Sequence, residues 1–251
     1  MTPTTDSRLA ADVETYFDST AASYDRAYRK RGSAGRVLRR RAAVAIGLLG
    51  SGSGDVLDVG MGAGFLCAEL DRRGWAVSGV DLAPAMVDGA RARLPHLRDR
   101  LVQGSVHALP FDDESFNAVV ATGVIEYAVD DLDGAVRELA RVLRPGGVAV
   151  VSYPNHRAPV TLWRGRVVYP LARVAKRVVP GAHGPGPPRV PLIAFDLLRR
   201  ALGGSGLTIE TVIPVGVRPA PARLAQRIER SDSWLAHALA VQLVLRARME
   251  A

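Results

Sequence analysis

Three glycines at alternate positions, Gly60, Gly62 and Gly64, stand between two patterned segments of the chain. The apolar run Val56–Val59 predicts a buried strand, and residues 63–72 predict a helix. Glycine lets the chain turn tightly and lets a ligand approach the backbone, and the first N–H groups of a helix are free to bind that ligand. This spacing therefore predicts a ligand-binding turn.

Two common ligands of such turns fit this sequence poorly. A P-loop for nucleoside triphosphates requires Gly-Lys-Ser/Thr after a longer loop, which is missing here. The dinucleotide fingerprint requires glycine at its sixth position, where this chain has Phe65, a side chain that obstructs close packing of helix on strand. The acidic residues around the turn point to a third ligand.

Asp58 stands two residues before Gly60, and Asp81 follows the apolar strand 76–80, 21 residues after Gly60. An acidic side chain beside the turn suits the cationic amino group of S-adenosylmethionine (SAM), and a carboxylate after the next strand accepts hydrogen bonds from both ribose hydroxyls. Alone, each aspartate is better explained as a cap: Asp58 of a strand end, and Asp81 of the helix at 84–94. Their joint spacing favours SAM.

Transfer of a methyl group requires a general base only if the acceptor is a hydroxyl or an acidic carbon. The candidates are His156, just after a predicted strand, and Tyr24 with Asp25 in the N-terminal arm. A solvated histidine and a packed tyrosine explain these residues without catalysis. No His/Cys/Asp/Glu cluster has metal-ligand spacing, so no metal site is predicted. Three further histidines are expected to lie farther from the site: His107, His183 and His237.

Short apolar runs alternate with helical patterns over most of the chain. Apolar strands separated by helices are typical of a parallel sheet covered on both faces, so the predicted fold is α/β, Rossmann-like and doubly wound. The predicted strands are Val56–Val59, 76–80, 101–103, 118–122, 148–153, 207–215 and 238–247; the predicted helices are 8–31, 36–49, 63–72, 84–94, 132–143 and 220–230.

The 251 residues are 48% apolar and 23% charged, which is typical of a folded globular protein. A single cysteine, Cys67, excludes a disulfide framework. The N-terminus has no apolar core of signal-peptide length, and no apolar run is long enough to span a bilayer, so the expected location is the cytoplasm.

Charge is unevenly distributed. Residues 1–155 hold 18 basic and 20 acidic residues, whereas residues 156–230 hold 13 basic and 3 acidic ones. The basic segment indicates an anionic neighbour, such as an anionic or amphipathic substrate, a peripheral membrane contact or nucleic acid. An equally good alternative is genomic base composition, since Lys30 and Lys176 are the only lysines.

The alternation of strands and helices stops between residues 156 and 205, around a loop rich in proline and glycine at Pro180–Pro191. This segment predicts a mobile cap inserted before the last two strands, which contacts the acceptor. The predicted organisation is an N-terminal helical arm, a SAM-binding core, the cap, and terminal strands that complete the sheet: 1–49, 50–155, 156–205 and 206–251.

Residues 12–155 resemble class I SAM-dependent methyltransferases. The matching segments are VLDVGMGAG, GVDLAPAMVDGAR, LVQGSVHALPFDDESFNAVVATGVIEY and VRELARVLRPGG, and the opening YFDSTAASYDRAY resembles the ubiquinone and menaquinone biosynthesis branch. The resemblance implies a seven-stranded, mostly parallel sheet with a reversed last strand, SAM as methyl donor, and acceptor specificity set outside the core.

The resemblance also implies a set of cofactor contacts. Asp58 and the glycine turn would surround the methionine part, Asp81 the ribose, and Leu82 and Met86 the adenine. The full set of implied contacts is Asp58, Gly60, Gly62, Gly64, Asp81, Leu82, Met86, Ser105, Val106 and Thr122.

The chain departs from the family pattern at two places. Relatives usually carry an acidic residue at the position of Ser105, where it contacts the adenine amino group; a serine hydroxyl or a backbone carbonyl can also accept that bond. Tyr127 follows Glu126 where the family often has histidine, and packing is the favoured role of this tyrosine.

Together these features predict a SAM-dependent methyltransferase for a small hydrophobic or amphipathic acceptor of secondary metabolism or of isoprenoid or lipid type. Two alternatives stay open: a nucleic-acid methyltransferase, and a SAM-binding protein that catalyses a cyclisation or only binds. No base-methylation tetrapeptide or aromatic-interleaved basic platform accompanies the basic charge. The oligomeric state is left open.

Overall fold

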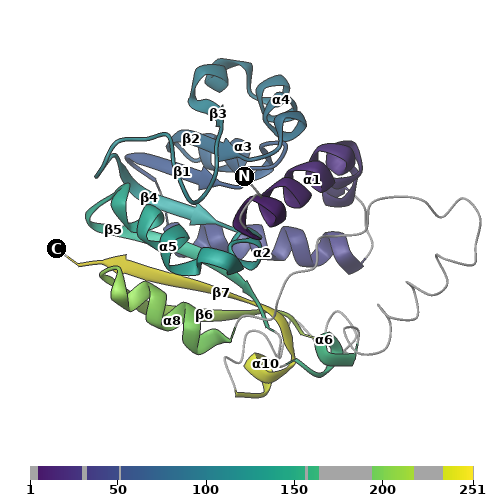
Figure 1. Ribbon diagram of the computed structural model, residues 1–251, viewed down its shortest axis with the longest axis vertical. Helices are drawn as coiled ribbons and strands as arrows, with labels where there is room; N and C mark the ends of the chain where they lie inside the picture. The colour runs from purple at the N-terminus through teal and green to yellow at the C-terminus, as the bar shows by residue number, and fades with distance from the viewer. Residues whose placement is uncertain are drawn as a thin grey trace, which may run out of the picture.

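The computed structural model describes residues 5–29, 33–50, 52–155, 158–163, 194–217 and 234–250. Its centre is a seven-stranded sheet with the order β3-β2-β1-β4-β5-β7-β6 (Figure 1). The strands are β1 (Asp55–Val59), β2 (Ala76–Asp81), β3 (Leu101–Gln103), β4 (Phe116–Ala121), β5 (Leu143–Pro154), β6 (Leu207–Val217) and β7 (Ala240–Met249).

The first five strands are parallel, and β7 pairs antiparallel with both β5 and β6. This order confirms the predicted seven-stranded, mostly parallel sheet with a reversed last strand. Strand β5 begins five residues earlier than predicted, because Leu143 already pairs with Phe116 before the register shifts near the turn at Gly146. The last strand begins two residues later than predicted, because residues 234–239 form a short helix instead.

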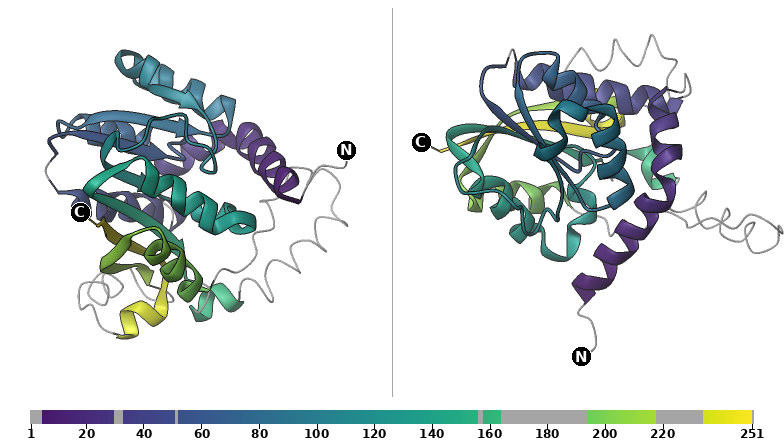
Figure 2. Two further views of the ribbon diagram at one scale, coloured as in Figure 1. Left: turned by 60° about the vertical axis from the view of Figure 1, so that its left-hand side comes forward. Right: turned by 90° about the horizontal axis from the view of Figure 1, so that it is seen from above.

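Helices cover both faces of the sheet, as Figures 1 and 2 show. They are α1 (Thr5–Arg29), α2 (Ser33–Leu49), α3 (Phe65–Asp71), α4 (Pro84–Arg93), α5 (Leu132–Arg141), α6 (Pro159–Trp163), α8 (Phe195–Gly204) and α10 (Trp234–Leu239), with short 3-10 turns η1 (Pro95–Arg100), η2 (Ile125–Tyr127) and η3 (Val129–Asp131). The predicted helix 220–230 lies outside the described residues.

The sheet separates two apolar cores. On one face, α2, α3 and α4 pack on Val56, Val77 and Val120. On the other face, α5 and α8 pack on Leu57 and Val119. Because successive side chains of a strand point to opposite faces, Asp58 shares the face of Val56 and points toward α2 and α3.

Helix α8 lies inside the predicted cap segment 156–205 but packs against α5 and β6, with Leu198 and Leu202 fully buried. Residues 195–204 are therefore part of the helical layer that covers the sheet. Most of the remaining segment, 164–193, lies outside the described residues, so the cap stays a prediction. In the described part of the chain, no helix combines the length and the apolar character that crossing a bilayer demands.

Candidate functional site

The glycine turn joins the ends of β1 and β2. The backbone N–H groups of Gly60 and Met61 both donate to the carbonyl oxygen of Val80, at 2.8 and 3.1 Å. Gly60 and Gly62 have φ angles of 68° and 52°, which side chains with a Cβ rarely adopt. Glycine is therefore required here by the backbone conformation itself.

Gly64 serves a different purpose from the other two glycines. It is the N-cap of α3 with a φ of 75°, and a Cβ on it would lie 3.1 Å from the Cβ of Ala90 in α4. Gly64 lines neither of the cavities described below. Close packing of α3 on α4 explains this glycine.

Asp81 links the turn to the helix that follows β2. Its Oδ2 accepts a hydrogen bond from the N–H of Gly62 at 2.8 Å, and its Oδ1 accepts one from the N–H of Ala83 at 3.0 Å. Burial raises the pKa of this carboxyl group, and the backbone donors oppose that shift. A carboxylate offers about four acceptor positions, so these backbone donors leave capacity for a ribose hydroxyl.

Asp58 is only 1% exposed. Its Oδ2 accepts a hydrogen bond from the thiol of Cys67 at 3.3 Å. Burial raises the pKa of Asp58 to about 7, with Asp81 adding to the shift and Arg41 of α2 opposing it. The carboxyl group is thus placed where a cation would find an incompletely compensated negative charge.

A cavity of about 820 Å³ opens at the carboxyl ends of the strands. The predicted cofactor residues that line it are Gly60, Gly62, Asp81, Leu82, Met86, Ser105, Val106 and Thr122. A smaller hollow of about 310 Å³ adjoins it, and Asp58 lines this hollow together with Gly60, Gly62 and Thr122. Gly64 is thus the only predicted cofactor residue outside both spaces.

Helix α1 forms the roof of the large cavity with Ala10, Val13, Glu14 and Phe17. The ring of Phe17 meets that of Tyr127 edge to face, with centroids 5.4 Å apart, and Asp18 accepts a hydrogen bond from the N–H of Ala85. The sequence already predicts that the N-terminal arm lies around the methyl group, and the apolar spacing of Val13 and Phe17 on one face of the arm is the signal for these residues.

The loop after β3 corrects the expectation that His107 is remote, because His107 lines the large cavity. The chain folds back on itself there: Ser105 Oγ accepts a hydrogen bond from the N–H of His107, and the Ser105 carbonyl accepts one from Ala108. Among the described residues, Nε2 of His107 has no hydrogen-bond partner. His237 does not line the cavity, and its Nε2 lies 3.3 Å from the carbonyl oxygen of Val212. His183 is outside the described residues.

The loop after β4 holds two further residues of interest. Tyr127 lines the cavity and packs on Phe17, in agreement with the packing role. Burial raises the pKa of Glu126, and its Oε2 has no hydrogen-bond partner within the described ranges. His156 and the side chain of Tyr24 lie outside the description, so their catalytic role stays a prediction.

Comparison with protein families matches residues 57–151 to a methyltransferase domain. The demethylmenaquinone methyltransferase of Tropheryma whipplei is 34% identical over 174 residues, which cover 67% of this chain and 70% of that protein.

Solved structures share the fold. Magnesium protoporphyrin IX methyltransferase from Synechocystis, with bound S-adenosylhomocysteine, has a TM-score of 0.63 at 19% identity and covers 96% of this chain and 100% of its own. Geranyl diphosphate C-methyltransferase from Streptomyces coelicolor has a TM-score of 0.58 at 18% identity and covers 86% of this chain and 82% of its own. The family match, the 34% identity to the Tropheryma whipplei enzyme over 70% of its length and the shared fold show the same family. The chain belongs to the class I SAM-dependent methyltransferases, with SAM as its cofactor.

Proposed function

We propose that this methyltransferase transfers the methyl group of SAM to a small, largely apolar acceptor held under α1, at the carboxyl ends of β1, β2 and β4. One observation carries the proposal. The glycine turn, Asp81 and the loops after β2, β3 and β4 all line the same cavity as the apolar face of α1. In a doubly wound sheet, ligands bind at this edge.

The residues present fit SAM. Asp58 would bind the ammonium group in the smaller hollow, and Asp81 would accept hydrogen bonds from the ribose hydroxyls with its free acceptor positions. Leu82 and Met86 offer an apolar surface for the adenine ring, and Ser105, Val106 and Thr122 complete the set. SAM supplies an already activated methyl group, so the protein has to align the acceptor and exclude water.

The part of the cavity that SAM leaves free favours an apolar acceptor. Val13 and Phe17 of α1 line this space together with Val124 and Tyr127 of the loop after β4, and the rings of Phe17 and Tyr127 are in contact at one side of it. Demethylmenaquinone and geranyl diphosphate, named for a relative and a structural neighbour, both combine an isoprenoid chain with a polar head. A hydrophobic or amphipathic isoprenoid or quinone acceptor is therefore the proposed class.

The direct test incubates the protein with methyl-labelled SAM and cell extract, and separates lipids, polar metabolites and RNA. Label is expected in the lipid fraction for a quinone acceptor and among the polar metabolites for an isoprenoid diphosphate. Demethylmenaquinone and geranyl diphosphate are then tested as pure acceptors. Asp81→Ala is the matched control, because it should weaken SAM binding and leave α1 and the loop after β4 unchanged. Label in RNA would support the nucleic-acid alternative. SAM binding without label in any fraction would support the cyclisation or binding alternative.

The basic segment is proposed to select an acceptor with negative charge through Arg164 and Arg173, which lie outside the described residues. Changing both to Gln should raise the acceptor KM and flatten its dependence on ionic strength, with SAM affinity unchanged. A KM that responds neither to salt nor to this double substitution would show that the arginines only face solvent or a membrane.

His156 and Tyr24 are proposed as bases for a hydroxyl acceptor. His156→Ala should lower kcat about 100-fold and leave SAM affinity unchanged, and Tyr24→Phe tests the second candidate in the same way. Full activity in both variants would show that alignment alone is sufficient.

A further inference from the structure

Asp58 has a narrowly defined set of neighbours. It is the penultimate residue of β1 and lines the smaller hollow beside the glycine turn. The charged and titratable groups that act on it come from three elements: Arg41 of α2, Cys67 of α3 and Asp81 at the end of β2. Of these, the Cys67 thiol donates a hydrogen bond to Oδ2 at 3.3 Å.

The Cys67 thiol is fixed in place by close packing. Cys67 is fully buried in the apolar core under α3. The nearby Gly79 of β2 leaves space for it, because a Cβ at that position would lie 3.2 Å from the sulfur of Cys67 and 2.4 Å from that of Met61. Burial and the charge of Asp58 raise the pKa of the thiol well above its ordinary value, so it stays protonated and can only act as a donor to the carboxylate.

We propose that Cys67 is a positioning residue: its thiol holds Asp58 by one carboxylate oxygen and thereby sets the pH range in which Asp58 can bind the ammonium group of the cofactor. This inference rests on the proposed placement of SAM. Cys67 itself makes no contact with the cofactor, since it lines neither cavity.

The sign of the effect follows from the charge of Asp58. Burial raises the pKa of Asp58, whereas the hydrogen bond from Cys67 and the charge of Arg41 lower it, and the net pKa is about 7. Below this pH the carboxyl group is neutral and attracts an ammonium group weakly, whereas above it the group is charged. Affinity for SAM should therefore rise as the pH increases toward 7.

Two substitutions change the donor in opposite directions. Cys67→Ser replaces a weak S–H donor with a stronger O–H donor of similar size, which should favour the charged form of Asp58. Cys67→Ala removes the donor. The pH midpoint of SAM affinity should therefore fall by about one unit in Cys67→Ser and rise by about one unit in Cys67→Ala. Ala68→Ser is the matched control, since it adds a hydroxyl to the same helix one position farther along.

The experiment measures the Kd of SAM by calorimetry between pH 5 and 9 for the wild type and the three variants. The ammonium group of SAM titrates identically against every protein, so only the differences between proteins report on Asp58. 5′-Methylthioadenosine, which lacks the amino-acid part, is the control ligand and should show no such differences. We expect the midpoint to be lowest in Cys67→Ser, intermediate in the wild type and highest in Cys67→Ala. Ala68→Ser should have the midpoint of the wild type.

Coincident midpoints for wild type, Cys67→Ser and Cys67→Ala would overturn the inference and leave the proposed function intact. Failure of the wild type to bind SAM at any pH would overturn the proposed function itself. Should Cys67→Ala not fold, Cys67→Ser decides alone: its midpoint should lie about one unit below that of the wild type. A midpoint equal to that of the wild type would also overturn the inference.

Discussion

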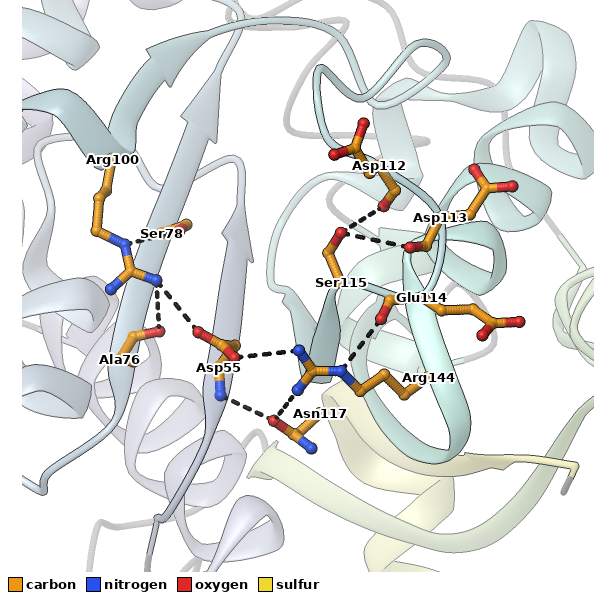
Figure 3. Close-up of polar contacts among 10 residues, drawn as sticks. All are labelled: Asp55, Ala76, Ser78, Arg100, Asp112, Asp113, Glu114, Ser115, Asn117 and Arg144. Atoms are coloured by element: carbon orange, nitrogen blue, oxygen red, sulfur yellow. Dashed lines mark hydrogen bonds and ion pairs between the residues drawn. The ribbon is translucent and has the colours of Figure 1, made fainter.

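Strand β1 carries one aspartate near each end, and the two have opposite surroundings. Asp55, at the amino end, lies between Arg100 and Arg144, each 3.3 Å from one of its oxygens (Figure 3). Asp58, three residues later, is buried, and its closest donor is a thiol. The carboxylate at the amino end is thus paired with two cations, whereas the carboxyl group at the other end accepts a hydrogen bond from a weak donor.

The amino end is closed by a continuous polar network. Asn117 Oδ1 accepts hydrogen bonds from the N–H of Asp55 and from Arg144, and Arg144 also donates to the carbonyl oxygen of Glu114. Figure 3 shows that these residues tie β1, β4 and β5 together. Because the polar groups there are already paired with one another, this edge of the sheet is suited to stability and not to ligand binding.

The carboxyl end shows the reverse arrangement. Burial raises the pKa of Asp58, Asp81 and Glu126, so the folded protein disfavours the charged form of all three. Stability given up at such positions is a common feature of functional sites. One strand can therefore stabilise the fold at its amino end and hold, at its carboxyl end, a buried carboxylate whose charged form is unfavourable until a ligand binds.

The largest effect is expected from a side chain placed in the glycine turn. Gly62→Val puts a β-branched residue at a φ of 52° and fills the space beside the cofactor. SAM binding should be lost, which corresponds to at least about 4 kcal/mol for a ligand with a micromolar Kd. Gly146→Val is the control at the other end, with a φ of 73° and no atom within 4 Å of its Cβ. It should cost stability but keep SAM affinity; equal loss of binding in both would contradict the site.

The next effect concerns the ribose carboxylate. Asp81→Ala should weaken SAM binding by about 2–4 kcal/mol, because two charge-assisted hydrogen bonds are lost. Asp55→Ala is the matched control at the amino end and should leave the Kd of SAM unchanged. Since Asp81 also accepts a hydrogen bond from the N–H of Gly62, circular dichroism should confirm that Asp81→Ala is folded. Unchanged calorimetric affinity in Asp81→Ala would remove it from the binding site.

Much of the cofactor edge could be predicted from the sequence because it depends on local patterns. The glycine spacing, Asp58 and Asp81 are fixed by strand ends that short apolar runs reveal. The roles of Gly64 and Cys67 could not be predicted, since both depend on the approach of a second element: Ala90 for Gly64 and the carboxylate of Asp58 for Cys67. Contacts between distant elements leave no periodic signal in one sequence.

The same reasoning explains the misplaced elements. The sequence places His107 far from the site, because nothing in its position along the chain shows that the loop folds back through Ser105. Helix α8 was assigned to the cap because the segment around it lacks alternation, yet its own Leu198 and Leu202 pack on the sheet. The arginine pairs of Asp55 join residues 45 and 89 positions apart, which spacing alone does not connect.

A third prediction uses the pH dependence of stability to separate the two aspartates. The pKa of Asp58 rises from 3.8 in the unfolded chain to about 7 in the fold, so the folded state binds more protons between these values. Its contribution to stability is complete below about pH 4 and is lost as the pH rises through 7, a fall of about 4 kcal/mol. Asp58→Asn should flatten the free energy of unfolding over this window, measured in urea without cofactor. An unchanged slope in Asp58→Asn would mean that another group titrates there.

The smallest effect is expected at the amino end. The Asp55 carboxylate is about one-third exposed and its two arginines are about 40% exposed, so water screens both ion pairs. Changing Arg100 or Arg144 to Gln should each lower the free energy of unfolding by about 0.5–1 kcal/mol, and less at high salt. Arg144→Gln should cost more of the two, because it also loses the bonds to Asn117 and Glu114, whereas Arg100→Gln loses bonds to Ser78 and Ala76 that are longer. SAM affinity should stay unchanged in both; a weakened Kd would show that the two ends of β1 are coupled and that the division between them does not hold.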